Sequence, residues 1–320
     1  MLAIQILTYV CVLLFLGFIV GRVVKYAKTP LHLRWELYPV AHEKGRAAYG
    51  GSIFEELEWW TKPRQVDRIG ELAEMLREIV FLKGVFRHNR PLWYFSYPFH
   101  LGLYLLVGWL GLLFMASLLF VFGIALGGGW FGYLVRYLVA ICGYGGLGLT
   151  AIGSLGLLAR RLGNRDIRRY SAPVEYINLV FILATVVTAL VVHISYDPWF
   201  GAPAAYMVSL ISFSSFDVGS QLPAGILVEL VLGSLLLAYI PMTRMAHFVS
   251  KYFLYHDVRW SDEPNQRGSK IEFQIKGNFA YRMNWQGPHI QSGKSWAEVG
   301  TSDMPKADDS GGEKAKEVQA

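Results

Sequence analysis

Residues 96–114 read SYPFHLGLYLLVGWLGLLF and contain no Asp, Glu, Lys or Arg. The apolar run extends over 97–122, and a helix needs about 20 mostly apolar residues to cross a hydrocarbon core of about 30 Å. Four more runs of this kind occupy 2–24, 132–159, 174–196 and 223–247. Only 17% of the 320 residues are charged, which is low for a soluble domain. The sequence therefore predicts an all-α integral membrane protein with a five-helix transmembrane bundle.

The distribution of positive charge predicts the direction of these helices. The connection 25–95 carries twelve Lys or Arg residues and the connection 160–172 carries five, whereas 123–131 and 197–222 carry none. By the positive-inside rule, the amino terminus lies outside and the carboxyl terminus is cytoplasmic, in a multi-pass protein of the cytoplasmic (inner) membrane. The positive charge behind the net value of +6 is not spread evenly along the chain and does not indicate a nucleic-acid partner.

The sequence divides into four parts. Within the connection, Pro63–Gly84 has apolar residues along one helical face, which predicts an amphipathic helix on the membrane surface or against a partner. The tail contains one alternating stretch, Ile271–Tyr281, a pattern typical of a strand, and its last ~20 residues have a disordered composition. The four expected parts are a first transmembrane helix (1–24), a cytoplasmic connection (25–95), a four-helix membrane core (96–252) and a cytoplasmic tail (253–320).

Cysteines are scarce and isolated. Cys11 and Cys142 both lie in apolar runs, and two separated cysteines cannot ligate an iron–sulphur cluster. Any cluster must therefore belong to a partner subunit.

The depth of the histidines in the membrane suggests a cofactor. His100 is near the cytoplasmic start of the second span and His247 is at the cytoplasmic end of the fifth, so antiparallel helices bring them to one depth. Two imidazoles at one depth suit the axial ligation of a haem b between helices. The alternative is a pair of interfacial histidines without a cofactor. Glycines of the second and third spans would allow either close helix contact or room for a macrocycle.

Two stretches resemble a known family. SYPFHLGLYLLVGWLGLLF (96–114) and YIPMTRMAHFVSKY (239–252) are similar to the second and fifth helices of the gamma (cytochrome b) subunit of respiratory nitrate reductase. The resemblance implies that His100 and His247 are the ligands of one haem b. That family has a second haem, whose ligand positions fall here at Leu110 and Glu229, so the second haem does not carry over.

A third stretch resembles a different branch. LHLRWELYPVAHEKGRAAYGG (31–51) is similar to cytochromes b found beside heterodisulphide-reductase-like iron–sulphur proteins, including complexes of sulphate-reducing bacteria. The resemblance implies a cytoplasmic iron–sulphur partner subunit of that type and menaquinone as exchangeable substrate. It also implies a role in sulphate respiration and allows a multihaem cytochrome c as a second partner on the outer side.

The exoplasmic half of the bundle contains further ionisable residues. Glu229 precedes His247 by eighteen residues, which in a continuous helix is five turns and places both on one face. Glu229 forms either an ion pair with Arg136 or, with His193, a quinone pocket that exchanges protons. A quinone near Glu229 would be far from a haem at His247 unless another carrier intervened, and His193 could ligate such a second haem together with Met115. Otherwise the quinone site lies closer to the first haem, on the cytoplasmic side.

Three arginines lie near the layer of His100 and His247. Arg90, Arg87 and Arg244 could pair with haem propionates, or they could serve as ordinary positive-inside anchors.

Two functions from different classes fit these features. The first is an electron-transfer subunit that connects the membrane quinone pool with a cytoplasmic iron–sulphur protein. The second is a cofactor-free membrane anchor in the same type of complex. The chain has no cluster motif and no nucleotide-binding glycine motif, so we do not expect it to be a complete enzyme. The five unrepeated spans do not fit a transporter.

Overall fold

The computed structural model describes residues 2–29, 43–124, 129–216 and 223–302. Part of the stretch 31–51 and most of the residues expected to be disordered lie outside these ranges. The described chain is helical, and two isolated bridges are its only β contacts. Five helices are long and apolar enough to cross a membrane, as in a multi-pass membrane protein. They are α1 (Leu2–Lys28), α4 (Arg90–Val121), α5 (Trp130–Gly163), α7 (Pro173–Ser195) and a fifth that includes α9 (Ala224–Tyr239).

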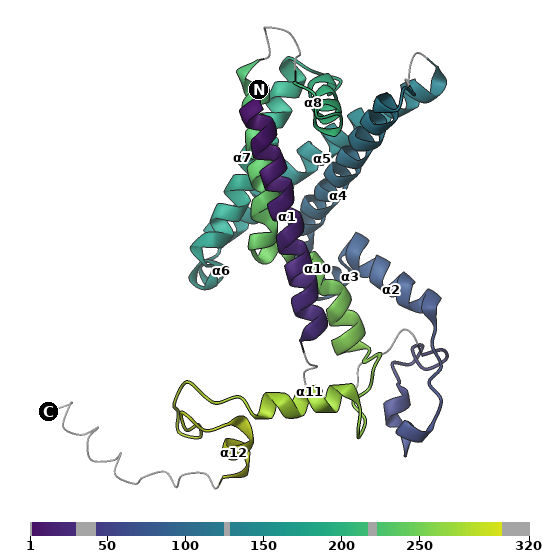
Figure 1. Ribbon diagram of the computed structural model, residues 1–320, viewed down its shortest axis with the longest axis vertical. Coiled ribbons are helices and arrows are strands. Elements are labelled where there is room, and N and C mark those ends of the chain that lie inside the picture. Colours follow the sequence, from purple (N-terminus) through teal and green to yellow (C-terminus); the bar gives the residue numbers. More distant parts are fainter. Residues whose placement is uncertain (1, 30–42, 125–128, 217–222, 303–320) are drawn as a thin grey trace, which may run out of the picture. The chain divides into compact units, whose positions relative to one another are not determined.

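The chain forms two compact units. One, here called the membrane unit, comprises residues 1–23 and 68–249, and the second unit comprises 24–67 and 250–320. In the membrane unit α4 packs along α5, α5 contacts α7, and α7 contacts α9 (Figure 1). The short helices of this unit are α2 (Arg68–Phe81), α3 (Lys83–His88), α6 (Arg165–Tyr170), α8 (Gly201–Ile211) and the start of α10 (His247–Phe253).

Glycines allow α4 and α5 to approach closely. A Cβ atom added at Gly153 would lie 2.5 Å from the backbone nitrogen of Phe99, and one at Gly146 would lie 2.8 Å from the side chain of Leu106. Such contacts are typical of small residues at membrane helix interfaces. At these positions the glycines serve helix contact, which is one of the two roles that the sequence left open.

The fifth span differs from the expected helix over 223–247. The α-helix ends at Tyr239, and two 3₁₀ turns, Ile240–Met242 and Arg244–Ala246, precede α10. Pro241 lacks the amide hydrogen that would continue the helix, and the amide of Met245 donates to the Thr243 hydroxyl instead of to the oxygen of Pro241. Arg22 of α1 binds the break, donating from Nε to the oxygen of Pro241 at 2.7 Å and from Nη2 to that of Thr243 at 3.1 Å.

Polar side chains join α1 to the rest of the membrane unit. The Thr8 hydroxyl lies 2.6 Å from that of Tyr206 and 2.8 Å from that of Ser234, and the Gln5 amide donates to the Ser209 hydroxyl at 3.1 Å. These buried groups satisfy one another, which an apolar environment requires. They also place α8 and the amino-terminal end of α1 at the same end of the membrane unit (Figure 1).

The expected amphipathic helix is present as α2. Ile69, Leu72 and Leu76 lie along one exposed face, with exposed fractions of 82%, 60% and 49%. The carboxyl end of α2 is fixed to α4, because the hydroxyl of Tyr104 donates to the Ile79 oxygen at 2.7 Å.

The second unit contains no strand at Ile271–Tyr281. Residues Lys270–Phe279 form α11 instead, and the short helix α12 (Trp296–Thr301) follows. The Ser269 side chain accepts a hydrogen bond from the amide of Glu272, and Glu272 pairs with Lys276 at 3.0 Å one turn later. Capping and this pair favour a helix, so the expectation of a strand is wrong.

Candidate functional site

His100 lies on α4 in a fixed orientation. Its Nδ1 is 2.7 Å from the backbone oxygen of Ser96, and the Ser96 hydroxyl lies 3.4 Å from the same atom. A carbonyl oxygen only accepts hydrogen bonds, so Nδ1 carries the proton and the lone pair of the neutral ring is on Nε2. Metal-binding histidines commonly have the second ring nitrogen held in this way.

His247 repeats this arrangement on another element. It is the first residue of α10, directly after the break in the fifth span. Its Nδ1 donates to the backbone oxygen of Arg244 at 3.2 Å. The Thr243 hydroxyl accepts from the amide of Met245 at 3.1 Å and fixes the preceding turn. The His247 side chain is exposed, whereas that of His100 is partly buried.

The structure brings these two rings together. Their centres are 6.0 Å apart and their planes are inclined by 72°. Two imidazoles whose nitrogens each lie about 2 Å from one shared metal ion have ring centres about 6 Å apart. The donor set, its spacing and the two carbonyl contacts therefore fit a pair of axial haem ligands.

The arginines expected near this pair make contacts of their own. The guanidinium of Arg90 lies over the ring of Phe86, 4.1 Å from its centre. Arg244 is highly exposed and lies 3.8 Å from a carboxylate oxygen of Glu175. Arg87 is in the last turn of α3. These positions are compatible both with pairing to haem propionates and with ordinary positive-inside anchoring.

The second candidate site pairs His193 with Glu229. His193 is completely buried and Glu229 is 8% exposed. The Nε2 atom of His193 lies 3.0 Å from Oε1 of Glu229, whereas Oε2 of Glu229 is buried and has no hydrogen-bond partner within the described part of the chain. A lone buried carboxylate oxygen is costly. The break at Pro241 also interrupts the continuous helix on which a shared face for Glu229 and His247 was expected.

Arg136 and Met115 are not part of this pair. The guanidinium of Arg136 lies 4.2 Å from the ring centre of Trp199, and among the described residues no ion pair joins it to Glu229. Met115 is 54% exposed. His193 has an oxygen next to each ring nitrogen, an arrangement that competes with its use as a ligand of a second haem. Of the residue pairs proposed for this half of the bundle, His193 and Glu229 of the quinone-pocket alternative are the ones that the structure brings into contact.

Sequence reasoning missed Asp197. This residue follows α7, and the backbone oxygen of Asp197 lies 3.0 Å and its Oδ2 lies 3.4 Å from His193 Nδ1. Its carboxylate also accepts from the amides of Gly201 and Ala202, at 2.8 and 2.9 Å, at the start of α8. Burial would raise the pKa of Asp197, but the hydrogen bonds from His193, Ala202 and Gly201 outweigh this effect and lower it. The spacing of four residues after His193 was the signal in the sequence.

Phe200 covers this site. Its ring centre lies 4.2 Å from that of His193, and Phe200 is completely buried. Its φ angle of 57° is in the left-handed region, which is uncommon for a bulky residue. Strain of this kind persists only where the surroundings enforce it, and it is frequent at functional sites.

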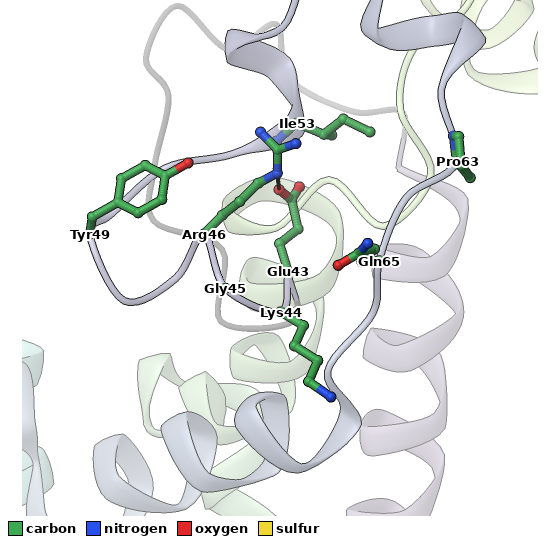
Figure 2. Close-up of a pocket in the computed structure, with 8 residues that line it drawn as sticks. All are labelled: Glu43, Lys44, Gly45, Arg46, Tyr49, Ile53, Pro63 and Gln65. Carbon is green, nitrogen blue, oxygen red and sulfur yellow. Dashed lines mark hydrogen bonds and ion pairs between the residues drawn. The ribbon is translucent and has the colours of Figure 1, made fainter.

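The second unit has a small polar cavity of about 360 Å³ between residues 43–53 and 63–65 (Figure 2). Glu43 is its most buried polar side chain, 1% exposed. Its carboxylate accepts from the Ile53 amide at 2.5 Å and from the Ser52 hydroxyl at 3.2 Å, and it lies 3.4 Å from Arg64 Nε. Arg64 in turn donates to the backbone oxygens of Trp260 and Ser261. Glu43 thus organises the fold of this unit.

Comparisons of the chain with family models, with curated proteins and with solved structures find no match.

Proposed function

We propose that this chain is the haem b membrane subunit of a respiratory redox complex that transfers electrons between the quinone pool and a cytoplasmic iron–sulphur subunit. The observation that carries the proposal is the approach of His100 and His247, each with Nδ1 bound to a backbone oxygen. When bound, haem b supplies a one-electron carrier within the membrane.

The chain itself would set the properties of that carrier. The carbonyl oxygens of Ser96 and Arg244 orient the two imidazoles and raise their basicity as ligands. The side chain of Tyr104 has its ring centre 6.4 Å from that of His100 and ties α2 to this layer. Arg90 and Arg244 are our candidates for partners of the propionates.

His193 and Glu229 supply the proton chemistry in this proposal. Oxidation of a quinol, preferably menaquinol, releases two protons with two electrons, so a base must lie beside the hydroxyl groups. Glu229 Oε2 is a buried acceptor available for such a hydroxyl, and His193 can share the proton on Oε1. Ten residues of α9 separate Glu229 from Tyr239, about 15 Å of helix, so this pair lies well away from the break before His247.

The proposed orientation follows the basic residues. Five arginines lie at the end of α5 and in α6, and the end of α1 that carries Arg22 lies beside the break at Pro241. We place this end in the cytoplasm and the amino terminus outside, in the inner membrane. The second unit would then dock a heterodisulphide-reductase-like partner, and the opposite face could receive a multihaem cytochrome c.

A redox titration of the purified protein tests the assignment of the quinone site. In the His193→Ala variant we expect an unchanged haem spectrum and midpoint potential but slower oxidation of a menaquinol analogue. If spectrum and quinol oxidation both remain unchanged, His193 has neither of its proposed roles. If the parent protein contains no haem, the redox function is wrong and the chain is a cofactor-free anchor.

A further inference from the structure

Three ionisable side chains lie in a line of close contacts. His193 Nε2 and Glu229 Oε1 are 3.0 Å apart, and His193 Nδ1 lies 3.0 Å from the backbone oxygen of Asp197 and 3.4 Å from its carboxylate Oδ2. The residues come from α9, from α7 and from the loop that leads to α8. The imidazole therefore has a carboxylate on each side, and each ring nitrogen can gain or lose a proton to one of them.

The line joins a less exposed carboxylate to a slightly more exposed one. His193 has no exposed surface, the Glu229 side chain is 10% exposed and that of Asp197 is 17% exposed. At the Glu229 end, Oε2 has no hydrogen-bond partner among the residues that the structure describes. A buried unpartnered carboxylate oxygen indicates a missing donor, because leaving it unsatisfied costs about 1–3 kcal/mol or more.

We propose that Glu229, His193 and Asp197 form a proton relay that accepts a proton from the hydroxyl of a bound quinol-class molecule at Glu229 and releases it at Asp197. The relay deepens the proposed function and rests on it for the identity of the donor. It adds Asp197 to the site and gives the proton an exit at the end of the membrane unit where α8 and the amino-terminal end of α1 lie.

Each transfer in the relay is an acid–base step. The O–H bond of the donor breaks and an O–H bond forms on Glu229, whose proton then forms an N–H bond at His193 Nε2. The imidazolium gives its Nδ1 proton to Asp197, and the Asp197 carboxyl releases it to water. The transfer leaves His193 with its proton on Nε2 instead of Nδ1, so the ring must exchange protons with water before it passes a second proton. One proton enters and one leaves, and no electron moves along the relay.

Neighbouring elements shield the relay and add few charges. From α5, the Tyr144 hydroxyl donates to the backbone oxygen of Pro198 at 3.1 Å, and Arg136 lies over Trp199. The ring of Phe200 separates His193 from Trp109, whose ring centre is 5.3 Å from that of Phe200. Glu229 and Asp197 are thus the ionisable partners in direct contact with His193.

A purely structural role for Asp197 predicts a different result. Asp197 also caps α8, and asparagine keeps an oxygen that accepts from the α8 amides but cannot carry the proton. The variant Asp197→Asn therefore separates capping from proton transfer. Asp166→Asn, at the exposed start of α6, is the matched control.

Infrared spectroscopy of the full chain in lipid nanodiscs tests the relay. With a menaquinol analogue added, we expect a protonated carboxyl band that disappears in Glu229→Gln and exchanges with D₂O about 100-fold more slowly in Asp197→Asn, as for loss of a general acid–base group. Haem content should stay unchanged in both variants. Parent-like exchange in Asp197→Asn, or the absence of a Glu229 band, would overturn the relay. Absence of haem would refute the proposed function while leaving this exchange readout intact.

Discussion

The imidazole rings of His100 and His247 have their centres 6.0 Å apart and their planes inclined by 72°, although they belong to different helices of the membrane unit. Each ring is fixed through Nδ1 by a carbonyl of its own helix or of the turn that precedes it. Helix packing alone does not require two oriented imidazoles at one place, whereas axial ligation of a haem does.

The contact between α4 and α5 should be disrupted by adding even one carbon atom at Gly153. In Gly153→Ala the new Cβ would meet the Phe99 backbone at 2.5 Å, so α4 must shift beside His100. We expect a loss of about 1–3 kcal/mol in unfolding free energy, as for overpacking, together with reduced haem content. Unfolding in detergent measures the first and the haem spectrum the second. Gly148→Ala should behave like the parent, because no described atom outside the adjoining part of its own helix lies within 4 Å of the new Cβ.

Arg22 should stabilise the break in the fifth span. In Arg22→Met the carbonyls of Pro241 and Thr243 lose a charged donor, and we expect a loss of about 1.5–3 kcal/mol in unfolding free energy. The exposed residue Lys25 provides a control through Lys25→Met. Equal unfolding midpoints for the two variants would show that Arg22 does not hold this turn.

The depressed pKa of Asp197 predicts acid sensitivity of the loop between α7 and α8. A carboxyl whose pKa is lower in the folded than in the unfolded state stabilises the fold above its ordinary pKa of 3.8, and this stabilisation is lost as the pH falls toward the folded value. Thermal unfolding followed from neutral to acidic pH should show a smaller decline for Asp197→Asn. Parallel curves for variant and parent would contradict the lowered pKa.

Glu43 should be essential for the order of the second unit. Glu43→Gln removes the carboxylate that lies 3.4 Å from Arg64 Nε in a buried network, and breaking buried ion pairs costs about 3–5 kcal/mol. We expect faster proteolysis of residues 43–65 and weaker capture of the iron–sulphur partner at unchanged haem content. Glu58→Gln, at an exposed position, is the control. Partner capture at the parent level would argue against docking through this unit.

The sequence predicted the positions of the membrane-spanning helices, because the membrane constrains their length and composition. A hydrocarbon core requires about 20 apolar residues per crossing, so four of the spans begin and end near their expected positions, although α4 starts earlier, at Arg90. There Asn89 caps the helix by accepting from the amide of Leu92 at 3.2 Å. The predicted helix of the fifth span, 223–247, was too long. The apolar sequence continues past Pro241, but the α-helical hydrogen bonds end at Tyr239.

The contacts of the candidate site were less accessible to sequence reasoning. The choice of His193 over Arg136 as the partner of Glu229 depends on how α7 packs against α9, which no local pattern encodes. Asp197 was missed because its loop was treated as a connection, whereas α8 follows it and needs a cap. The alternation at Ile271–Tyr281 was misleading because capping at Ser269 favours a helix.

The most direct test is the amount of haem b per polypeptide in the purified full chain and in the variants His100→Ala and His247→Ala. The control is His289→Ala, at an exposed position of the tail. We predict one haem in the parent and in the control, and none in either ligand variant that remains folded. A folded parent without haem, or ligand variants that retain it, would contradict the account. A second haem would require His193 to give up one of its oxygen contacts.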